Sequence, residues 1–369
     1  MRLNPKWTSI LRRPGLGLLL FFPAVLAGPQ ARAADSIRYE ATHAAMGTVF
    51  AVVAYGADRD YLSEVANEVF DEIDGLDAQM SYHRASSEIS GINRDAAREP
   101  VLVEPRLFHL LQYSVRRSAE TGGAFDITVG PLMKAWGFFR GQGRLPAPSE
   151  IAAVLQRIGY RHLLLNEADR SIRFDHTGME IDLGAIAKGY AVDQAVEILR
   201  SRGVQSALVS SGTSSIYALG SPPGERGWQV SIRSPYDAKK AADIVRLQNF
   251  SVSISGDYEK FFRIGGKLYC HIMDPHTGRP VENMLATAAL AAHAVETDGI
   301  STSFFVMGTE GTRKYLATHP NLVGILYRPT AAKGVFKRVL LRSPLYRLPP
   351  DALVEIEGPG VAPSTPGQP

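Results

Sequence analysis

The stretch MEIDLGAIAKGYAVDQAVEILRSRGVQSALVS, residues 179 to 210, places a strand, a helix and a second strand in immediate succession. Residues 179–183 predict a strand, and Gly184 permits a tight turn after it. The following segment predicts a helix over 185–202 that ends at Gly203, a common C-terminal signal. Residues 206–210 then predict the second strand. How such units combine depends on the rest of the chain.

The chain after residue 210 is rich in β signal. Segments with strand composition are separated by Gly, Pro or Asp turns, and one helix interrupts them. The predicted strands cover 228–233, 250–255, 267–273 and 285–293; the helix covers 298–307, and a last strand pair lies near Val323 and Val339.

The chain before residue 179 is mainly helical. Residues 36–53 predict a strand pair broken at 46–48, and apolar spacing predicts a helix over 61–80. A second helix covers 105–120, and Ser149 is expected to cap a short third one. Helices and strands mix without strict βαβ alternation, so the sequence predicts the α+β class, with mixed or antiparallel sheets packed with helices.

The length of 369 residues predicts one large domain or two fused ones. A composition of 45% hydrophobic and 21% charged residues excludes collagen-like, coiled-coil and largely disordered classes. The single cysteine, Cys270, excludes an internal disulfide, and its apolar neighbours favour a buried thiol. We place the folded domain at 36–348 and a disordered Pro/Gly-rich tail at 358–369.

Residues 1–33 have the composition of a signal peptide. Basic residues precede an apolar run from Leu16 to Ala27, and Ala31-Arg32-Ala33 has the small-x-small pattern of a cleavage site. We therefore expect export to the periplasm. An uncleaved segment would instead associate the protein with the inner membrane, and both Sec and twin-arginine export remain open.

The basic charge of the chain is concentrated in that segment. Removing residues 1–33 takes away five of 40 basic residues and none of 37 acidic ones, which leaves 35 against 37, a net charge of −2. Without a basic stripe in the mature part, we expect no nucleic-acid partner.

The stretch ETDGISTSFF presents oxygen donors on one helix face. Asp298, Ser301 and Thr302 stand at i, i+3 and i+4, and a set of oxygen ligands without thiolate or imidazole suits Mg²⁺. The alternative is a helix cap at Thr297 or Asp298 with the hydroxyls bonded back to the helix.

Two further stretches have features of ligand binding. Lys188 lies in the first turn of the helix that follows Gly184, where free N–H groups stabilise an anion such as phosphate; the alternative is an exposed lysine. In GGAFDITVGPLMKAWGFF, paired glycines, Asp126 and an aromatic cluster suggest a loop that grips a ring system, although such clusters are more often core.

The stretch CHIMDPHTGRPV, residues 270–281, predicts a tight turn. Asp274 or Thr277 bonds the backbone, which leaves His276 and Arg279 facing solvent. His271, on the strand entering the turn, is expected to face a pocket as a general base or acid, with a satisfied strand histidine as the alternative. A zinc site on His271, Asp274 and His276 is a weaker reading, because a proline lies between the ligands.

Together, these stretches resemble the FAD:protein FMN transferases, the ApbE family. The resemblance rests on six ordered motifs: MGT at 46–48, AFDITVGPLMKAWGF, IDLGAIAKGYAVD, SISGDYEKFF, HIMDPHTGRPV and TDGISTSFFVMG. It covers about residues 41–345 and implies an ApbE-like, T-fold-related architecture.

The resemblance also implies an activity and a site. Such an enzyme binds FAD and Mg²⁺, cleaves FAD with release of AMP, and attaches FMN through a phosphoester to a threonine of a partner flavoprotein. The partner is expected to belong to a membrane redox system. The implied metal ligands are the Ala185 carbonyl, Asp298 and Thr302, with Ser301 an added candidate. The implied FAD-binding residues are Met46, Tyr82, Ala124, Phe125, Asp126, Asp182, Lys188 and Ile272.

The chain departs from the family pattern at three places. It has Ser211-Gly212-Thr213-Ser214 where Gly-Gly-Asp is usual, Gly184-Ala185 where two glycines are frequent, and Ser301 where relatives carry Asp or Ala. These departures bear on the choice of acceptor and on the metal geometry more than on FAD binding. The alternative function is an FAD-binding protein, or an FAD pyrophosphatase without transfer to protein.

Overall fold

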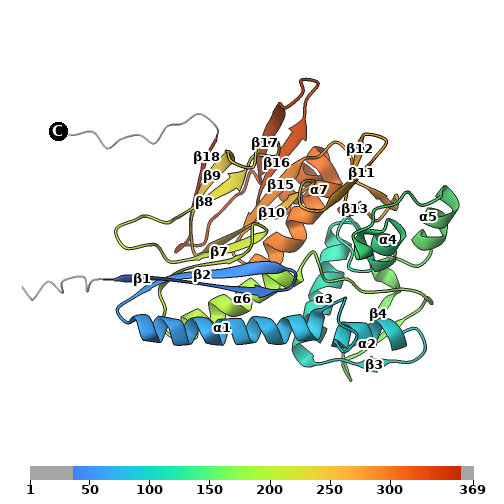
Figure 1. Cartoon of the computed structure of the whole chain (residues 1–369), viewed down its shortest axis with the longest axis horizontal. Helices are drawn as coiled ribbons and strands as arrows, with labels where there is room; N and C mark the ends of the chain where they lie inside the picture. Colours follow the sequence, from blue (N-terminus) through green and yellow to red (C-terminus); the bar gives the residue numbers. More distant parts are fainter. Residues whose placement is uncertain (1–35, 359–369) are drawn as a thin grey trace, which may run out of the picture. The chain divides into compact units, whose positions relative to one another are not determined.

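The computed structural model describes residues 36–358, so the predicted signal peptide and most of the predicted tail lie outside the described part (Figure 1). Its main feature is an eight-stranded sheet in which every neighbouring pair is antiparallel. The strand order is β1 (Ile37–Ala45), β2 (Thr48–Gly56), β6 (Ser206–Ser211), β7 (Ser215–Leu219), β10 (Phe250–Gly256), β15 (Ala286–Ala291), β16 (Val323–Pro329) and β17 (Phe336–Arg342).

Helices cover one face of this sheet, and a smaller sheet covers part of the other. The helices are α1 (Arg59–Met80), which runs along the β1–β2 hairpin in Figure 1, α6 (Ala187–Ser201) and α7 (Ala294–Ala317). The smaller sheet has the order β18 (Leu353–Glu357), β9 (Ala241–Gln248) and β8 (Trp228–Arg233). Helices on one face of antiparallel sheets are the arrangement expected of the α+β class.

Strand β10 shows why its two faces differ. Phe250, Val252 and Ile254 pack with the smaller sheet in one hydrophobic cluster. The alternate residues are the buried serines Ser251, Ser253 and Ser255, whose hydroxyls bond side chains of α7. The period of two thus gives this strand one apolar and one hydroxyl face.

The remaining elements extend the molecule beyond the large sheet. They are α2 (Glu88–Asp95), α3 (Pro105–Glu120), α4 (Gly130–Ala135), α5 (Pro148–Leu155) and a sheet of β3 (Val101–Leu102), β5 (Ser171–Phe174) and β4 (Leu163–Asn166). The hairpin β11 (Phe261–Ile264) and β12 (Lys267–Cys270) and the pair β13 (Met273–Asp274) and β14 (Arg279–Pro280) complete them. No helix within 36–358 combines the length and apolar character needed to cross a membrane.

Several predicted elements are confirmed, among them the broken strand pair, the first two helices and the strands that begin at Ser206, Trp228 and Phe250. The predicted strand 179–183 is wrong: the segment joins no ladder, and other parts of the chain satisfy its backbone. Ile181 exchanges two hydrogen bonds with the Asn93 side chain, and the Asp182 N–H donates to Ile127 O at 2.7 Å. The cap at Ser149 is also wrong, since α5 begins one residue earlier with Pro148.

Three boundaries differ for reasons of tertiary structure. Helix α7 begins at Ala294 rather than 298, because the Asp193 carboxylate of α6 accepts the N–H groups of Ala294 and Val295, each at 2.8 Å. The predicted strand 267–273 is interrupted at 271–272. Strand β18 pairs with β9 although it lies after residue 348.

Candidate active site

A cavity of about 630 Å³ opens where α6, α7 and the end of β10 meet the loops of the helical part. All but one of the predicted site residues line it: Met46, Tyr82, Ala124, Phe125, Asp126, Asp182, Ala185, Lys188, His271, Ile272, Asp298 and Thr302. The exception is Ser301. Segments far apart in sequence therefore converge on one cavity.

The oxygen-rich wall of the cavity lies where α6 contacts α7. The Gly189 N–H donates to Asp298 Oδ2 at 2.8 Å, and Lys188 Nζ lies 3.9 Å from the same oxygen. A Cβ at Gly189 would lie 2.2 Å from Ala294 O and 2.6 Å from Asp298 Cβ. Only glycine allows the two helices to approach this closely.

This contact leaves a carbonyl unpaired at the start of α6. In an α-helix, the N–H of Gly189 would donate to the carbonyl of Ala185. Here it donates to Asp298 instead, and no backbone N–H within 36–358 outside the regular helix and strand ladders donates to Ala185 O. Asp298 Oδ1 likewise has no hydrogen-bond partner among these residues.

Ser301 does not face the cavity, so its prediction as a metal ligand is wrong in geometry. Its side chain is 0% exposed, and its hydroxyl bonds Ser255 Oγ at 2.9 Å and Asp298 O at 3.0 Å. The neighbouring Thr302 lines the cavity, and its hydroxyl lies 3.2 Å from Ser255 Oγ.

The anion-binding wall combines Lys188 with the start of α6. The Lys188 ammonium donates to Gly184 O at 2.7 Å, which holds the cation at the cavity wall in the first turn of the helix. Asp182 closes this turn by accepting the Gly184 N–H at 2.9 Å, and burial raises the pKa of its carboxyl. The wall therefore offers a fixed cation and a helix N-terminus to an anion.

Asp126 organises its loop rather than presenting an open carboxylate. One oxygen accepts the N–H and the hydroxyl of Thr128 at 2.8 and 2.7 Å, and the other accepts the Tyr160 N–H at 2.8 Å. Burial raises its pKa, although these hydrogen bonds oppose the shift.

Aromatic rings form another part of the cavity lining. Phe139 stacks on His83 at 4.7 Å and meets Tyr82 edge-on at 5.2 Å. The Tyr82 hydroxyl donates to Glu180, which also binds Lys134 Nζ at 2.7 Å. Burial, followed by this carboxylate, strongly raises the Tyr82 pKa. Trp136, predicted in the same cluster, instead donates to Gly278 O at 2.8 Å outside the cavity lining.

His271 lies at the cavity wall where β12 ends. Its Nδ1 is 3.1 Å from Lys260 O, and a carbonyl only accepts, so Nδ1 carries the proton and Nε2 holds a lone pair. Burial, with the charge of Lys260, lowers the pKa of the imidazole to about 4. The ring is therefore neutral at neutral pH.

The predicted turn after His271 is confirmed. Asp274 accepts the N–H of His276 at 2.9 Å and the Thr277 hydroxyl at 3.0 Å, and Gly278 has a φ of 65°. Arg279 is exposed, as expected. The His276 side chain is 56% exposed, and its Nε2 lies 2.9 Å from Gly122 O. This contact connects the turn to the loop before Asp126.

The zinc reading fails on geometry. His276 Nδ1 is 3.0 Å from Asp274 Oδ1, but the His271 ring bonds Lys260 instead of joining them. Among residues 36–358, the group with metal-ligand spacing is His162, Asp175 and His176, which lies outside the cavity lining. Its carboxylate is already shared by both imidazoles, at 3.0 and 2.7 Å.

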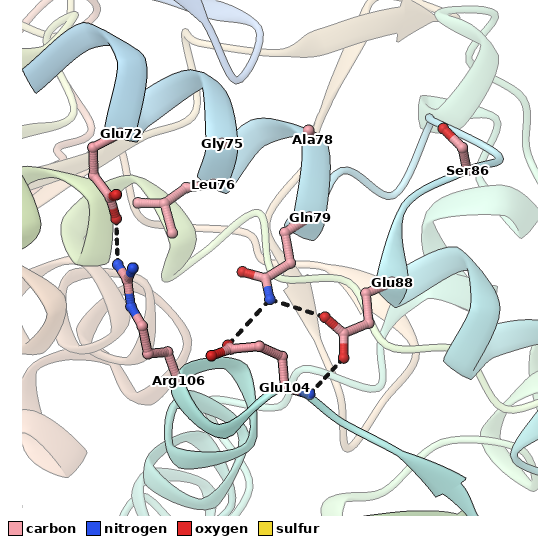
Figure 2. Close-up of a pocket in the computed structure, with 9 residues that line it drawn as sticks. All are labelled: Glu72, Gly75, Leu76, Ala78, Gln79, Ser86, Glu88, Glu104 and Arg106. Carbon is pink, nitrogen blue, oxygen red and sulfur yellow. Dashed lines mark hydrogen bonds and ion pairs between the residues drawn. The ribbon is translucent and has the colours of Figure 1, made fainter. Parts of the chain in front are cut away.

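A second, smaller cleft of about 460 Å³ lies between α1, α2 and α3 (Figure 2). Figure 2 shows Gln79 bridging the carboxylates of Glu88 and Glu104, and Arg106 paired with Glu72. The charged and amide side chains of this cleft thus bind one another, in contrast to the open oxygens of the first cavity.

Sequence reasoning missed several cavity residues. They are Thr48, His83, Thr213, Arg233, Ser255 and Glu259, and Glu180 behind Tyr82. Thr213 belongs to the segment that departs from the family pattern, and this segment forms part of the cavity lining. Thr48, Ser255 and Glu259 lie within motifs quoted for the resemblance but were assigned no role. His83, Arg233 and Glu180 carry no local signal, because only the tertiary fold brings them to the cavity.

Comparison with known proteins agrees with this arrangement. The model of the ApbE family matches residues 46–326. The FAD:protein FMN transferase of Salmonella typhimurium is 31% identical over 271 residues, 72% of this chain and 77% of that protein. That of Treponema pallidum is 31% identical over 291 residues, 74% and 80% of the two chains.

Solved structures give the same result for the fold. The ApbE protein of Thermotoga maritima superposes with a TM-score of 0.75 at 28% identity, over 84% of this chain and 97% of that one. The flavinyl transferase ApbE of Pseudomonas stutzeri superposes with a TM-score of 0.72 at 27% identity, over 84% of this chain and 96% of that one. The α+β, ApbE-like architecture expected from the resemblance is confirmed, and the chain belongs to the ApbE family.

Proposed function

We propose that this protein is an exported, Mg²⁺-dependent FAD:protein FMN transferase. It cleaves FAD, attaches FMN through a phosphoester to a threonine of an acceptor flavoprotein, and releases AMP. The family assignment supports the flavin transfer. The observation that carries the finer proposal is one cavity lined together by unpaired oxygen donors, Lys188, a neutral His271 and aromatic rings.

The oxygen donors fit Mg²⁺. The Ala185 carbonyl lacks its helical partner, Asp298 Oδ1 is unbonded among residues 36–358, and Thr302 lines the same cavity. Mg²⁺ takes a few protein oxygens and completes its shell with water and phosphate oxygens. Bound there, it would polarise the diphosphate and neutralise charge on the leaving AMP.

The remaining walls suit the other parts of FAD. Lys188 and the N-terminus of α6 would bind the diphosphate, because both offer positive charge at the same wall. The rings of Tyr82 and Phe139 and the side chains of Met46 and Ile272 would contact the ring systems. Asp126 would act indirectly, by holding the loop that carries Ala124 and Phe125.

His271 would act as general base. Its Nε2 accepts the proton of the threonine hydroxyl while the threonine oxygen forms a bond to the phosphorus of the FMN half. The bond from that phosphorus to the bridging oxygen breaks, and AMP leaves with the bridging oxygen and its electron pair. Lys188 stabilises the negative charge that develops there. With water in place of threonine, the same steps would give FMN and AMP.

The test uses the purified mature protein with FAD, Mg²⁺ and a threonine-bearing acceptor. We expect covalent flavin on the acceptor and one AMP for each flavin attached. Simultaneous replacement of Asp298 and Thr302 by Ala should abolish both products. AMP release without flavin on the acceptor would favour the pyrophosphatase, and intact transfer by the double variant would overturn the proposal.

Export and partners follow from the sequence and the proposed activity. The composition of residues 1–33 supports a periplasmic enzyme, or an inner-membrane-associated one if the segment is retained. The acceptor would be a flavoprotein of a membrane redox system. Cell fractionation with N-terminal sequencing of the mature chain tests the first point, and a cytoplasmic protein that retains residue 1 would refute it.

A further inference from the structure

A row of hydroxyl groups runs inward from the oxygen-rich wall, between β10 and α7. Ser255 of β10 lies 2.9 Å from Ser301 Oγ and 3.2 Å from Thr302 Oγ1. Ser301 Oγ lies in turn 3.0 Å from the carbonyl oxygen of Asp298. Three hydroxyls and one carbonyl thus form a continuous chain that starts at the cavity and ends inside the protein.

The chemistry of the groups fixes the direction of every hydrogen bond in this chain. A carbonyl only accepts, so Ser301 donates its proton to Asp298 O. The contact between Ser255 and Ser301 then requires the proton of Ser255. The contact between Ser255 and Thr302 therefore requires the proton of Thr302. The three hydroxyls supply three protons for three contacts. This assignment of donors and acceptors is therefore the only one in which every contact is a hydrogen bond.

We infer that Ser255 and Ser301 are positioning residues that make the Thr302 hydroxyl donate into the protein and leave its lone pairs facing the cavity. This inference rests on the proposed function, in which Thr302 binds Mg²⁺. A hydroxyl that coordinates a cation must point its proton away from the ion, and Ser255 supplies the acceptor for that proton. Partners behind the ligands orient metal sites in this way in general.

The same chain explains the position of Ser301. Its hydroxyl cannot serve as a ligand at the cavity, because the side chain is fully buried and both of its contacts lie inside the protein. Its backbone is also anchored, since Thr287 Oγ1 donates to Ser301 O at 2.7 Å. Ser301 thus acts on Thr302 through Ser255.

The test measures binding of Mn²⁺ alone to the full folded chain, by electron paramagnetic resonance of the free ion. Ser255→Ala removes the acceptor of the Thr302 proton and should raise the dissociation constant about tenfold or more. Ser253→Ala is the matched control. Ser253 is a buried serine on the same face of β10, but it bonds Thr297 Oγ1 at 2.7 Å and lies outside the chain, so its loss should leave Mn²⁺ affinity unchanged.

Three further variants separate positioning from a merely structural role. Ser255→Thr restores a hydroxyl and should restore binding. Ser301→Ala should weaken binding, but the double variant of Ser255 and Ser301 should bind no more weakly than Ser255→Ala, because both changes break one chain. Multiplied effects in the double variant would overturn the inference by making Ser301 an independent contributor.

Asp298→Ala distinguishes failure of the inference from failure of the proposed metal site. If it weakens Mn²⁺ binding while Ser255→Ala binds like the parent protein, the hydroxyl chain has no role and the metal site stands. If Asp298→Ala itself binds Mn²⁺ like the parent, the ion does not occupy this wall and both proposals fall.

Discussion

Replacing Gly189 with Ala should destabilise the protein, although alanine is the better helix former. The new Cβ would lie 2.2 Å from Ala294 O and 2.6 Å from Asp298 Cβ, both within the packed α7. Since packed carbon atoms prefer about 3.5–4.0 Å, the two helices would have to separate by roughly 1 Å.

The magnitude follows from three contributions. Overpacking costs about 1–3 kcal/mol. Weakening the 2.8 Å hydrogen bond from the Gly189 N–H to the Asp298 carboxylate costs roughly 1.5–3 kcal/mol more. Alanine returns about 1 kcal/mol of helix propensity. We expect a net loss near 3 kcal/mol in the free energy of unfolding, together with weaker Mn²⁺ binding.

Gly75 provides the matched control, because it lies in α1, is exposed, and has no other atom within 4 Å of the position that an added Cβ would take. Gly75→Ala should therefore gain about 0.5–1 kcal/mol. Urea unfolding of both variants and the parent measures the two shifts. A Gly189→Ala protein that unfolds at the same urea concentration as Gly75→Ala, or a higher one, would refute the close-contact argument.

Three other perturbations test separate parts of the structure. Because the pKa of His271 is lowered to about 4, this group should cause no fall in kcat/KM for FAD between pH 8 and about pH 5. A fall in kcat/KM near pH 6.5 that vanishes in His271→Gln would contradict the lowered pKa of His271. Lys188→Met should weaken FAD binding by roughly tenfold or more in a fluorescence titration, whereas Lys188→Arg should lose less affinity. If both variants bind FAD as tightly as the parent protein, Lys188 does not belong to the diphosphate site. Asp243→Ala should lower the free energy of unfolding, measured in urea, by about 3–5 kcal/mol, because the buried carboxylate pairs with Arg338 Nε at 2.7 Å. Mn²⁺ affinity should stay unchanged. A loss under about 1 kcal/mol would show that this ion pair is not needed for stability.

The sequence predicted the site better than the elements that carry it. Asp298, Lys188 and His271 stood out because each sits beside a local signal, namely a row of oxygen donors, a glycine turn or a Pro-Gly turn. Ser301 and Thr302 could not be told apart. In a helix they lie about 60° and 40° to opposite sides of Asp298, so only the packing of α7 on β10 decides which one faces the cavity.

The misses share a physical cause, which is dependence on partners distant in sequence. Helix α7 starts at Ala294 because of a carboxylate at position 193. Residues 179–183 form no strand, and Asn93 and Ile127 bind the backbone of Ile181 and Asp182 in place of a neighbouring strand. The role of Ser255 depends on two hydroxyls across a sheet–helix interface. No local propensity encodes any of these contacts.

The double attachment between α6 and α7 has a consequence for how this enzyme can diversify. Asp193 holds the beginning of α7 at one point, and Gly189 holds Asp298 one helical turn away, so two contacts fix Asp298 and Lys188 relative to each other. Changes in the protein that receives the flavin must then be accommodated elsewhere. The β11–β12 hairpin, which precedes His271 and includes the exposed Phe261, lies outside this double attachment, so we expect changes of acceptor preference there rather than in α6 or α7.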